Sequence, residues 1–189
     1  MTRYAGRKAL VVGEYTGIGL AIAKRLVEGG ATVVLTVPTA PERAHAAAEL
    51  GSTARVVTPS RLEAALIASS GPGPEATTGG LDLLFSDAIA TARPLLPHLG
   101  DGSAIVLTAP APCPDAIQAL AAELAGRGIR VNAVAPGCIE APGAHTVALP
   151  PLGRLGAAEE VARAALFLAT EATFTTGVRL PVDGGLGPA

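Results

Sequence analysis

Short apolar runs alternate with segments of helical periodicity along most of this chain of 189 residues. Runs of four to six apolar residues without polar alternation are typical of strands that are buried on both faces. Strands and helices in alternation predict an α/β fold, in which helices cover both faces of a parallel sheet. About seven strands are expected, at residues 9–12, 32–37, 54–58, 81–85, 104–108, 129–134 and 178–182.

The segments between these runs predict the helices. Residues 17–28, 41–50, 115–125 and 158–169 are expected to be helical. A capping box at Ser60–Glu63 predicts a further helix that ends at about residue 68. A short helix is expected at about residues 92–99, interrupted by two prolines. Residues 69–80 are predicted to be a loose connector inside a single domain that spans residues 1–189.

Composition excludes several kinds of partner. The formal net charge is −2, so no basic face is expected to bind nucleic acid. No apolar run is long enough to cross a bilayer, and the first residues lack the apolar segment of a secretory signal. Two cysteines are too few for a disulfide framework and suit a reducing compartment. We therefore expect a cytoplasmic protein that binds neither nucleic acid nor membrane.

Three glycines stand between the first predicted strand and the first predicted helix. Gly13, Gly17 and Gly19 have the spacing G-x-x-x-G-x-G. Glycines at such a position let the backbone approach a pyrophosphate that the helix N-terminus holds. The alternative is that they serve only a tight turn and close helix packing. A glycine loop by itself does not decide between the two.

Further motifs follow the glycine loop in a fixed order. They are Gly128–Gly137 (GIRVNAVAPG), Pro151–Gly156 (PLGRLG), Glu159–Ala162 (EEVA) and Pro181–Gly185 (PVDGG). Together these motifs closely resemble the short-chain dehydrogenase/reductase family over nearly the whole chain. The resemblance implies a Rossmann-like doubly wound sheet that binds NAD or NADP. It implies cofactor contacts at Gly13, Gly17, Ile18, Gly19, Pro136, Gly137 and Ile139.

The family's Ser-Tyr-Lys-Asn catalytic set has no counterpart at the matching positions. The only tyrosines are Tyr4 and Tyr15, and the only lysines are Lys8 and Lys24. The family's catalytic positions correspond here to Ser86–Ile89 followed by a largely deleted helix, to Thr108–Pro110, and to Ala111–Pro114. The substrate lid is reduced to residues 142–150. No catalytic residue is therefore assigned.

Tyr4 and Lys8 reproduce the Tyr-x-x-x-Lys spacing, but they precede the first strand. The chemistry requires both side chains on one helical face beside the nicotinamide. The pair is expected to lie in a solvated N-terminal tail.

The cofactor site also departs from the family. Val37 stands where an acidic residue takes the ribose hydroxyls, and Thr58 where an Asp meets the adenine. Glu14 places a carboxylate in the phosphate loop, where like charges disfavour each other. Cys138–Ala141 replaces the segment that holds the nicotinamide amide. We expect NAD or NADP to bind weakly or not at all.

Other polar residues follow predicted strands. A thiol site is conceivable because Cys113, Cys138, Glu140 and His145 all follow carboxyl ends of strands. Asp87 is a candidate general base, although a cap or turn former is the commoner role. His45 and His98 are expected on the surface, and no metal site is expected because no paired ligand spacing occurs. Arg130, Asn132 and the Asp183–Gly185 turn are expected to be structural.

The sequence supports three hypotheses of function. The first is a family member without ordinary ketoreductase activity, acting as an auxiliary subunit or in atypical chemistry. The second is an NAD(P)-dependent oxidoreductase with replaced catalytic residues, and the third is a small-ligand-binding module. Because truncated helices are expected to leave apolar strand faces, a homodimer or a hetero-oligomer with an active relative is predicted. The candidate surfaces are residues 92–99, 115–125 and 178–186.

Overall fold

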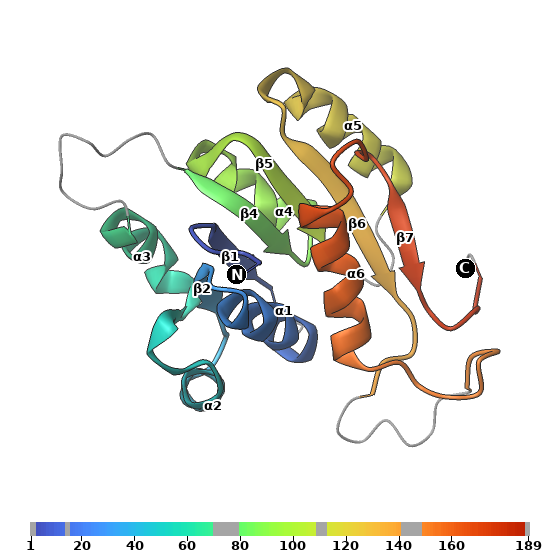
Figure 1. Cartoon of the computed structure of the whole chain (residues 1–189), viewed down its shortest axis with the longest axis horizontal. Helices are drawn as coiled ribbons and strands as arrows, with labels where there is room; N and C mark the ends of the chain where they lie inside the picture. The colour runs from blue at the N-terminus through green and yellow to red at the C-terminus, as the bar shows by residue number, and fades with distance from the viewer. Residues whose placement is uncertain (1–2, 14–15, 70–79, 109–112, 141–148, 188–189) are drawn as a thin grey trace.

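The computed structural model describes residues 3–13, 16–69, 80–108, 113–140 and 149–187. They form a parallel sheet of seven strands in the order β3-β2-β1-β4-β5-β6-β7 (Figure 1). The strands are β1 (Lys8–Val12), β2 (Thr32–Thr36), β3 (Ala54–Val57), β4 (Leu81–Ser86), β5 (Leu99–Leu107), β6 (Arg130–Pro136) and β7 (Arg179–Val182). The order reverses between β1 and β4, which confirms the doubly wound sheet predicted from the sequence.

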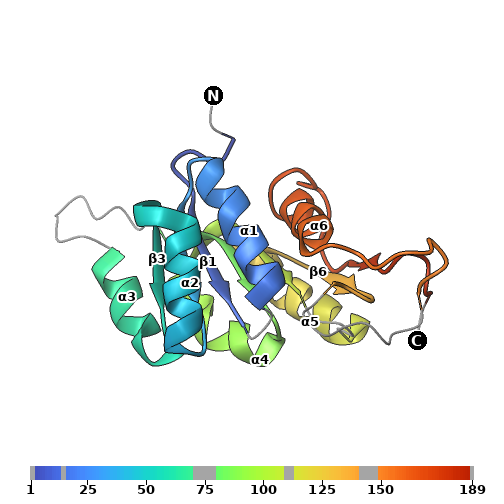
Figure 2. The same cartoon turned by 90° about the horizontal axis from the view of Figure 1, so that it is seen from below.

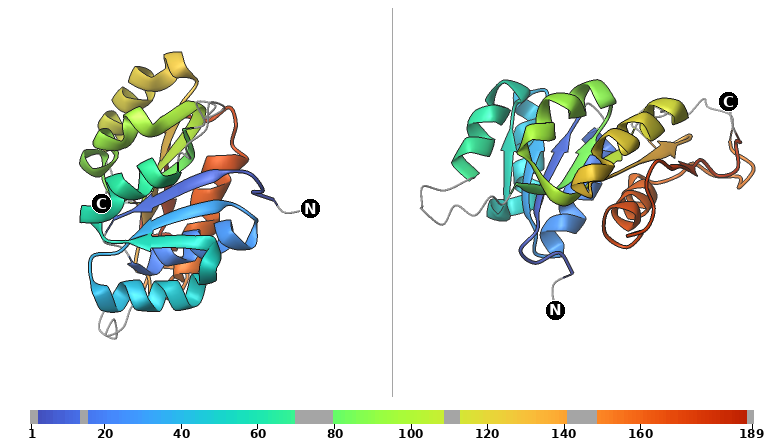
Figure 3. Two further views of the ribbon diagram at one scale, coloured as in Figure 1. Left: turned by 90° about the vertical axis from the view of Figure 1, so that its left-hand side faces the viewer. Right: turned by 90° about the horizontal axis from the view of Figure 1, so that it is seen from above.

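Helices cover both faces of this sheet. One face carries α1 (Thr16–Glu28), α2 (Ala40–Leu50) and α6 (Ala158–Thr170). The other carries α3 (Leu62–Ser69), α4 (Ile89–Ala92), the 3₁₀ helix η3 (Arg93–His98) and α5 (Pro114–Leu124). Figure 2 shows α1 and α6 on the side opposite α4 and α5, and the right-hand view of Figure 3 shows α3, α4 and α5 side by side. None of the helices in the described ranges is long and apolar enough to span a membrane.

Local sequence explains where α2 begins, but the cap that it predicts for α3 is not the one that the structure shows. Thr39 caps α2, because its hydroxyl accepts from the Glu42 N–H while the Glu42 carboxylate accepts from the Thr39 N–H. The capping box predicted at Ser60–Glu63 is wrong. Ser60 lies inside a 3₁₀ turn, Pro59–Arg61, and its hydroxyl is 3.1 Å from that of Thr58. Pro59 at the first position of that turn sets its start.

The segment between β4 and β5 also differs from the prediction. Instead of one helix at residues 92–99, α4 is followed by η3, and β5 begins at Leu99 rather than at residue 104. Pro94 and Pro97 lack an N–H, so the chain continues as a tighter turn. Leu99 then pairs with Leu81, and the register shifts before Leu83. Pairing with β4 therefore makes a strand of residues whose own composition does not suggest one.

Tyr4 is buried, not solvated as predicted for the N-terminal tail. Its exposed fraction is 7%, and its backbone N–H donates to the Gly29 carbonyl at 2.7 Å. A Cβ on Gly29 would lie 2.1 Å from the Tyr4 ring, so the ring occupies the space that this glycine leaves. Tyr4 is a core residue at the amino edge of the sheet.

The shortened helices do cover the strand faces. Ile117, Leu120 and Leu124 of α5 lie on one buried face, as predicted. The apolar side chains of β4, β5 and β6 are all buried between the two helical layers. The expected exposed strand faces beneath residues 92–99 and 115–125 are therefore wrong. Exposed apolar side chains gather instead in the last part of the chain, at Leu149, Leu152, Phe167, Phe174, Val178 and Leu186.

Candidate functional site

Gly13 ends β1 at the carboxyl edge of the sheet and has a φ of +136°, which favours glycine. A Cβ at this position would lie 2.7 Å from the Asp87 Cβ. Gly13 is therefore needed both for its backbone conformation and for close approach to the residue that follows β4. Glu14 and Tyr15 lie outside the described residues, so the effect predicted for Glu14 stays a prediction.

The rest of the glycine loop belongs to the first turn of α1. Ile18 is 5% exposed and lies in the core, which leaves its backbone rather than its side chain to face a ligand. A Cβ on Gly19 would lie 3.4 Å from Val11, and one on Gly17 would lie 4.0 Å from Ala158. Gly19 therefore lies against β1, whereas Gly17 faces the start of α6.

The second predicted cofactor segment is held by the C-terminal part of the chain. The Gly137 N–H donates to the Val182 carbonyl at 3.0 Å, and a Cβ on Gly137 would lie 2.6 Å from the Asp183 Cα. Ile139 forms a bridge with Gly156 and packs against the core. Pro136 ends β6 and is buried. These contacts are structural: those of Gly137 hold the end of β6 against β7, and the bridge at Ile139 joins the following residues to the segment before α6.

The structure places the two segments at the same edge of the sheet, with two strands between them. The segment at Gly13 follows β1 and the segment at Gly137 follows β6, with β4 and β5 between them. Three inter-strand spacings of about 4.8 Å separate them by roughly 14 Å. An extended ligand would have to lie across the ends of β4 and β5 to meet both.

Asp87 and Thr108 line a small hollow beside Gly13, at the carboxyl ends of the strands. It measures about 20 Å³ and is otherwise bounded by Val11, Val12, Gly13, Gly19, Leu35 and Val37. The Thr108 hydroxyl donates its proton to the Ser86 carbonyl at 3.4 Å, so this proton is already used in a hydrogen bond. The sequence alone leaves Asp87 as a candidate base, cap or turn former. Its position beside Gly13 was not foreseen, because no local pattern encodes a contact across 74 residues.

A larger hollow, of about 290 Å³, lies where β6 and β7 end. Its lining residues are Cys138, Leu152, Arg154, Gly156, Glu160 and Pro181–Gly185. The Asp183 carboxylate accepts from the Gly185 N–H at 2.9 Å, which fits the structural turn predicted there. Cys138 lines this hollow, whereas Cys113 is exposed at the start of α5.

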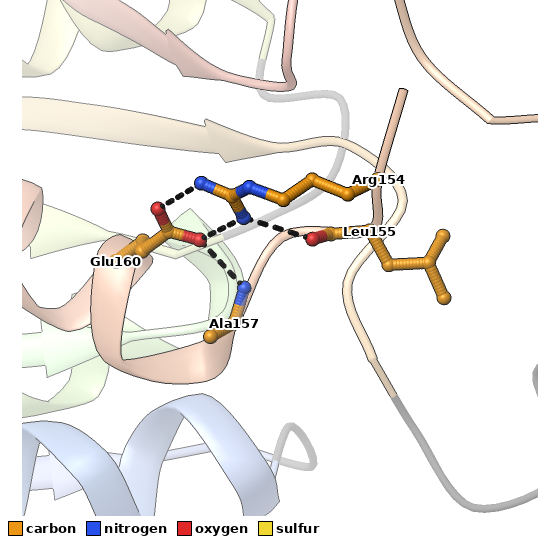
Figure 4. Close-up of polar contacts among 4 residues, drawn as sticks. All are labelled: Arg154, Leu155, Ala157 and Glu160. Atoms are coloured by element: carbon orange, nitrogen blue, oxygen red, sulfur yellow. Dashed lines mark hydrogen bonds and ion pairs between the residues drawn. The ribbon is translucent and has the colours of Figure 1, made fainter. Parts of the chain in front are cut away.

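The wall of this hollow is fixed by an ion pair at the start of α6 (Figure 4). The Arg154 guanidinium donates to both Glu160 oxygens, at 2.7 and 2.8 Å, and to the Leu155 carbonyl at 3.0 Å. The Glu160 carboxylate also accepts from the Ala157 N–H at 2.9 Å. These bonds lower the pKa of Glu160 to about 2, the Arg154 hydrogen bond contributing most, and they raise the pKa of Arg154.

Replacing Glu160 by glutamine is expected to change how stability depends on pH. Because the folded pKa of Glu160, about 2, is below its ordinary value of 4.5, its stabilisation is complete above pH 4.5 and is lost as pH falls through 2. Urea unfolding of wild type and E160Q should therefore differ most near neutrality and converge in acid. E63Q is the matched control, since Glu63 is exposed in the first turn of α3. Parallel pH profiles for wild type and E160Q would contradict this assignment.

The remaining candidates do not assemble into a second site. His45 is exposed on α2, as predicted, and His98 is partly buried at the end of η3, near the amino edge. Glu140 is exposed, and His145 lies outside the described residues. Within the described ranges no group of three or more His, Cys, Asp or Glu side chains could hold a metal ion.

Comparison with known proteins gives consistent relatives. The profile of short chain dehydrogenase matches residues 7–69, and that of enoyl-(acyl carrier protein) reductase matches residues 101–187. The chain is 30% identical to the 3-oxoacyl-(acyl-carrier-protein) reductase of Salmonella typhimurium, over 97% of this chain and 98% of that protein. The corresponding reductase of Escherichia coli is 31% identical, over 97% and 98%.

Solved structures agree. A 3-ketoacyl-(acyl-carrier-protein) reductase from Brucella melitensis in complex with NADH superposes with a TM-score of 0.76 at 27% identity, over 96% of this chain and 98% of that one. The alignment to the Salmonella protein is 239 residues long, against 189 residues here, so the relative carries segments that this chain lacks. With both profiles matched in order and relatives aligned from end to end, the chain belongs to the short-chain dehydrogenase/reductase family of oxidoreductases.

Proposed function

We propose that this chain is a short-chain dehydrogenase/reductase without ordinary ketoreductase activity, which acts as an auxiliary subunit or in a reaction that needs no Tyr-Lys pair. The positions of the tyrosines and lysines are the main support for this proposal, because the sequence has neither residue type after Lys24. Tyr4 is buried in the core, and Lys8 begins β1 at the amino edge, away from the Gly13 loop. Lys24 forms an ion pair with Glu49, its Nζ 3.3 Å from the carboxylate.

The structure of the cleft supports weak rather than tight dinucleotide binding. The backbone at Gly13 and Gly19 fits a phosphate-binding turn in its glycine content and its position before α1. Val37, 4% exposed, presents an apolar side chain where dinucleotide-binding sheets place an acid for the ribose. If a dinucleotide binds, it would supply hydride transfer, and the glycine loop at Gly13 and Gly19 would hold its pyrophosphate.

We expect reduction of simple ketones and of an acetoacetyl thioester to run close to the uncatalysed rate. A positioned proton donor is typically worth ~100- to 10,000-fold, and no candidate donor is assigned. NADH and NADPH oxidation should be followed at 340 nm, a wavelength set by the reduced nicotinamide, with the Escherichia coli reductase as the positive control. Turnover within about tenfold of that control, corresponding to about 1.4 kcal/mol in the barrier, would favour instead an oxidoreductase with replaced catalytic residues.

The hollow beside Cys138 supports a small-ligand-binding role as the second candidate function. Its volume of about 290 Å³ is close to the lower end of small-molecule sites, roughly 300 Å³. Such a role needs no hydride transfer and no catalytic set.

For assembly we propose a homodimer formed by the C-terminal apolar surface, defined as Phe167, Phe174, Val178 and Leu186. β7 is the outermost strand, paired only with β6, and this surface includes residues on either side of β7. A hetero-oligomer with an active relative is the alternative occupant.

A further inference from the structure

Asp87 follows β4 and stands directly over the glycine that ends β1. The carbon atoms of its side chain come within 2.7 and 2.9 Å of the point where a Cβ on Gly13 would lie. The topology produces this contact, because β4 pairs with β1 in parallel and Val12 is in register with Ser86. The carboxylate is thus held at the point where the strand order reverses, which is where open α/β sheets bind ligands.

One oxygen of the Asp87 carboxylate lacks a donor. Its Oδ1 atom is buried and accepts no hydrogen bond. Removing a polar oxygen from water without a partner is costly, so such an atom calls for an explanation. Rotation about the terminal torsion of Asp exchanges two equivalent oxygens, so either can face the hollow.

The hollow that Asp87 lines has the size and position for a hydroxyl group. Its volume of about 20 Å³ exceeds the roughly 10–15 Å³ that one water-sized group requires. Leu35 and Val37, from the end of β2, form its apolar side. In dinucleotide-binding sheets the end of β2 supplies the acid that accepts the ribose hydroxyls. Here β2 has no such acid, and a carboxylate with one unpartnered oxygen enters the same hollow from β4.

We propose that Asp87 accepts the ribose hydroxyls of an adenosine-type nucleotide, in place of the acidic residue that β2 lacks. The site then prefers a ligand with an unmodified 2′-hydroxyl, because a 2′-phosphate would bring two negative groups into a hydroxyl-sized space. NAD is accordingly preferred to NADP. The proposal rests on the proposed function only in taking the reductase cleft as the ligand site, and it requires no turnover.

Calorimetric titration with NAD⁺, NADP⁺ and adenosine tests the proposal without any activity assay. Adenosine carries no phosphate and isolates the ribose contact from the glycine loop. Wild type should bind NAD⁺ at least tenfold more tightly than NADP⁺. D87A should weaken NAD⁺ and adenosine about tenfold, since hydrogen bonds to charged groups are the stronger class. The isosteric D87N keeps an acceptor of the same shape, so a smaller loss of NAD⁺ affinity is expected.

The control is D101N, which removes a carboxylate that is 77% exposed at the amino end of β5. It should leave every affinity unchanged. Equal affinities of wild type for NAD⁺ and NADP⁺ would overturn the proposal, as would unchanged or tighter NAD⁺ binding by D87A. No binding of adenosine or NAD⁺ at millimolar concentration would overturn it too. None of these results touches the proposed loss of ketoreductase activity, which fails only if carbonyl reduction is observed.

Discussion

Replacing Arg130 by alanine is expected to cost about 3 kcal/mol of unfolding free energy, the largest loss that we predict for a single side chain. The Arg130 guanidinium donates to the carbonyls of Leu168, Ala169 and Ala172, at 2.6, 2.5 and 3.1 Å. The Leu168 and Ala169 carbonyls lie in the last turn of α6, where carbonyls lack a partner within the helix, and the Ala172 carbonyl follows the helix. Burial lowers the pKa of Arg130 from its ordinary value, but the group stays charged at neutral pH and opposes the negative end of the helix.

Thermal unfolding provides the measurement. A loss of about 3 kcal/mol in a chain of this size corresponds to a fall in Tm of roughly 6–12 °C. R130K should lie between R130A and wild type, because an ammonium group keeps the charge but cannot fork between carbonyls. R43A is the control, since Arg43 is exposed on α2. If R130A melts within about 2 °C of wild type, a shift worth less than about 1 kcal/mol, Arg130 does not hold α6.

The sequence predicted the frame of this fold because its strands are buried on both faces. Continuous apolar runs such as residues 9–12 are typical of a parallel sheet that helices cover on both faces. The predicted structural pair Arg130 and Asn132 also fits, since the Asn132 amide donates to the Thr175 carbonyl and its oxygen accepts from the Val178 N–H. Arg130 connects β6 with the end of α6, and Asn132 connects β6 with the segment before β7.

Prediction failed where a long-range contact decides the local structure. Residues 99–103 have no strand pattern, and β5 begins there because Leu99 pairs with Leu81. Burial of Tyr4 depends on the space that Gly29 leaves at the end of α1. Periodicity in the sequence reveals neither contact. It therefore places Leu99 at the end of a helix, leaves residues 100–103 outside the strand and assigns Tyr4 to solvent.

In the candidate site, too, motifs in the sequence predict some residues, and long-range contacts determine which residues lie beside them. Spacing marks Gly13 and the family resemblance marks Gly137, yet a Cβ on these glycines would lie closest to Asp87 and Asp183, which are distant in sequence. Asp183 belongs to the Pro181–Gly185 motif, whereas Asp87 belongs to none, and its place beside Gly13 follows from the pairing of β4 with β1. The carboxylate that we propose for ribose binding is therefore one that the family motifs do not mark.

Purified wild-type protein is expected to run at the mass of two chains. The C-terminal apolar surface contains Phe174, fully exposed at 105%, and Phe167, exposed at 47%. Soluble monomers rarely leave large contiguous apolar surfaces in water, so we expect these side chains to be covered, and two-fold homodimers are the commonest soluble assembly. Changing both phenylalanines to glutamate places charges where apolar burial is expected, so the double variant should run at the mass of one chain.

Light scattering after gel filtration measures these masses at micromolar protein. The control is A48E, because Ala48 is exposed on α2, at the opposite end of the sheet from β7. It should leave the mass of two chains unchanged. A wild-type monomer that gains mass only with a reductase encoded beside it would replace the homodimer by the auxiliary-subunit assembly. A wild-type monomer that ignores such a reductase would refute both assemblies, because Phe167 and Phe174 would then stay in water without a partner.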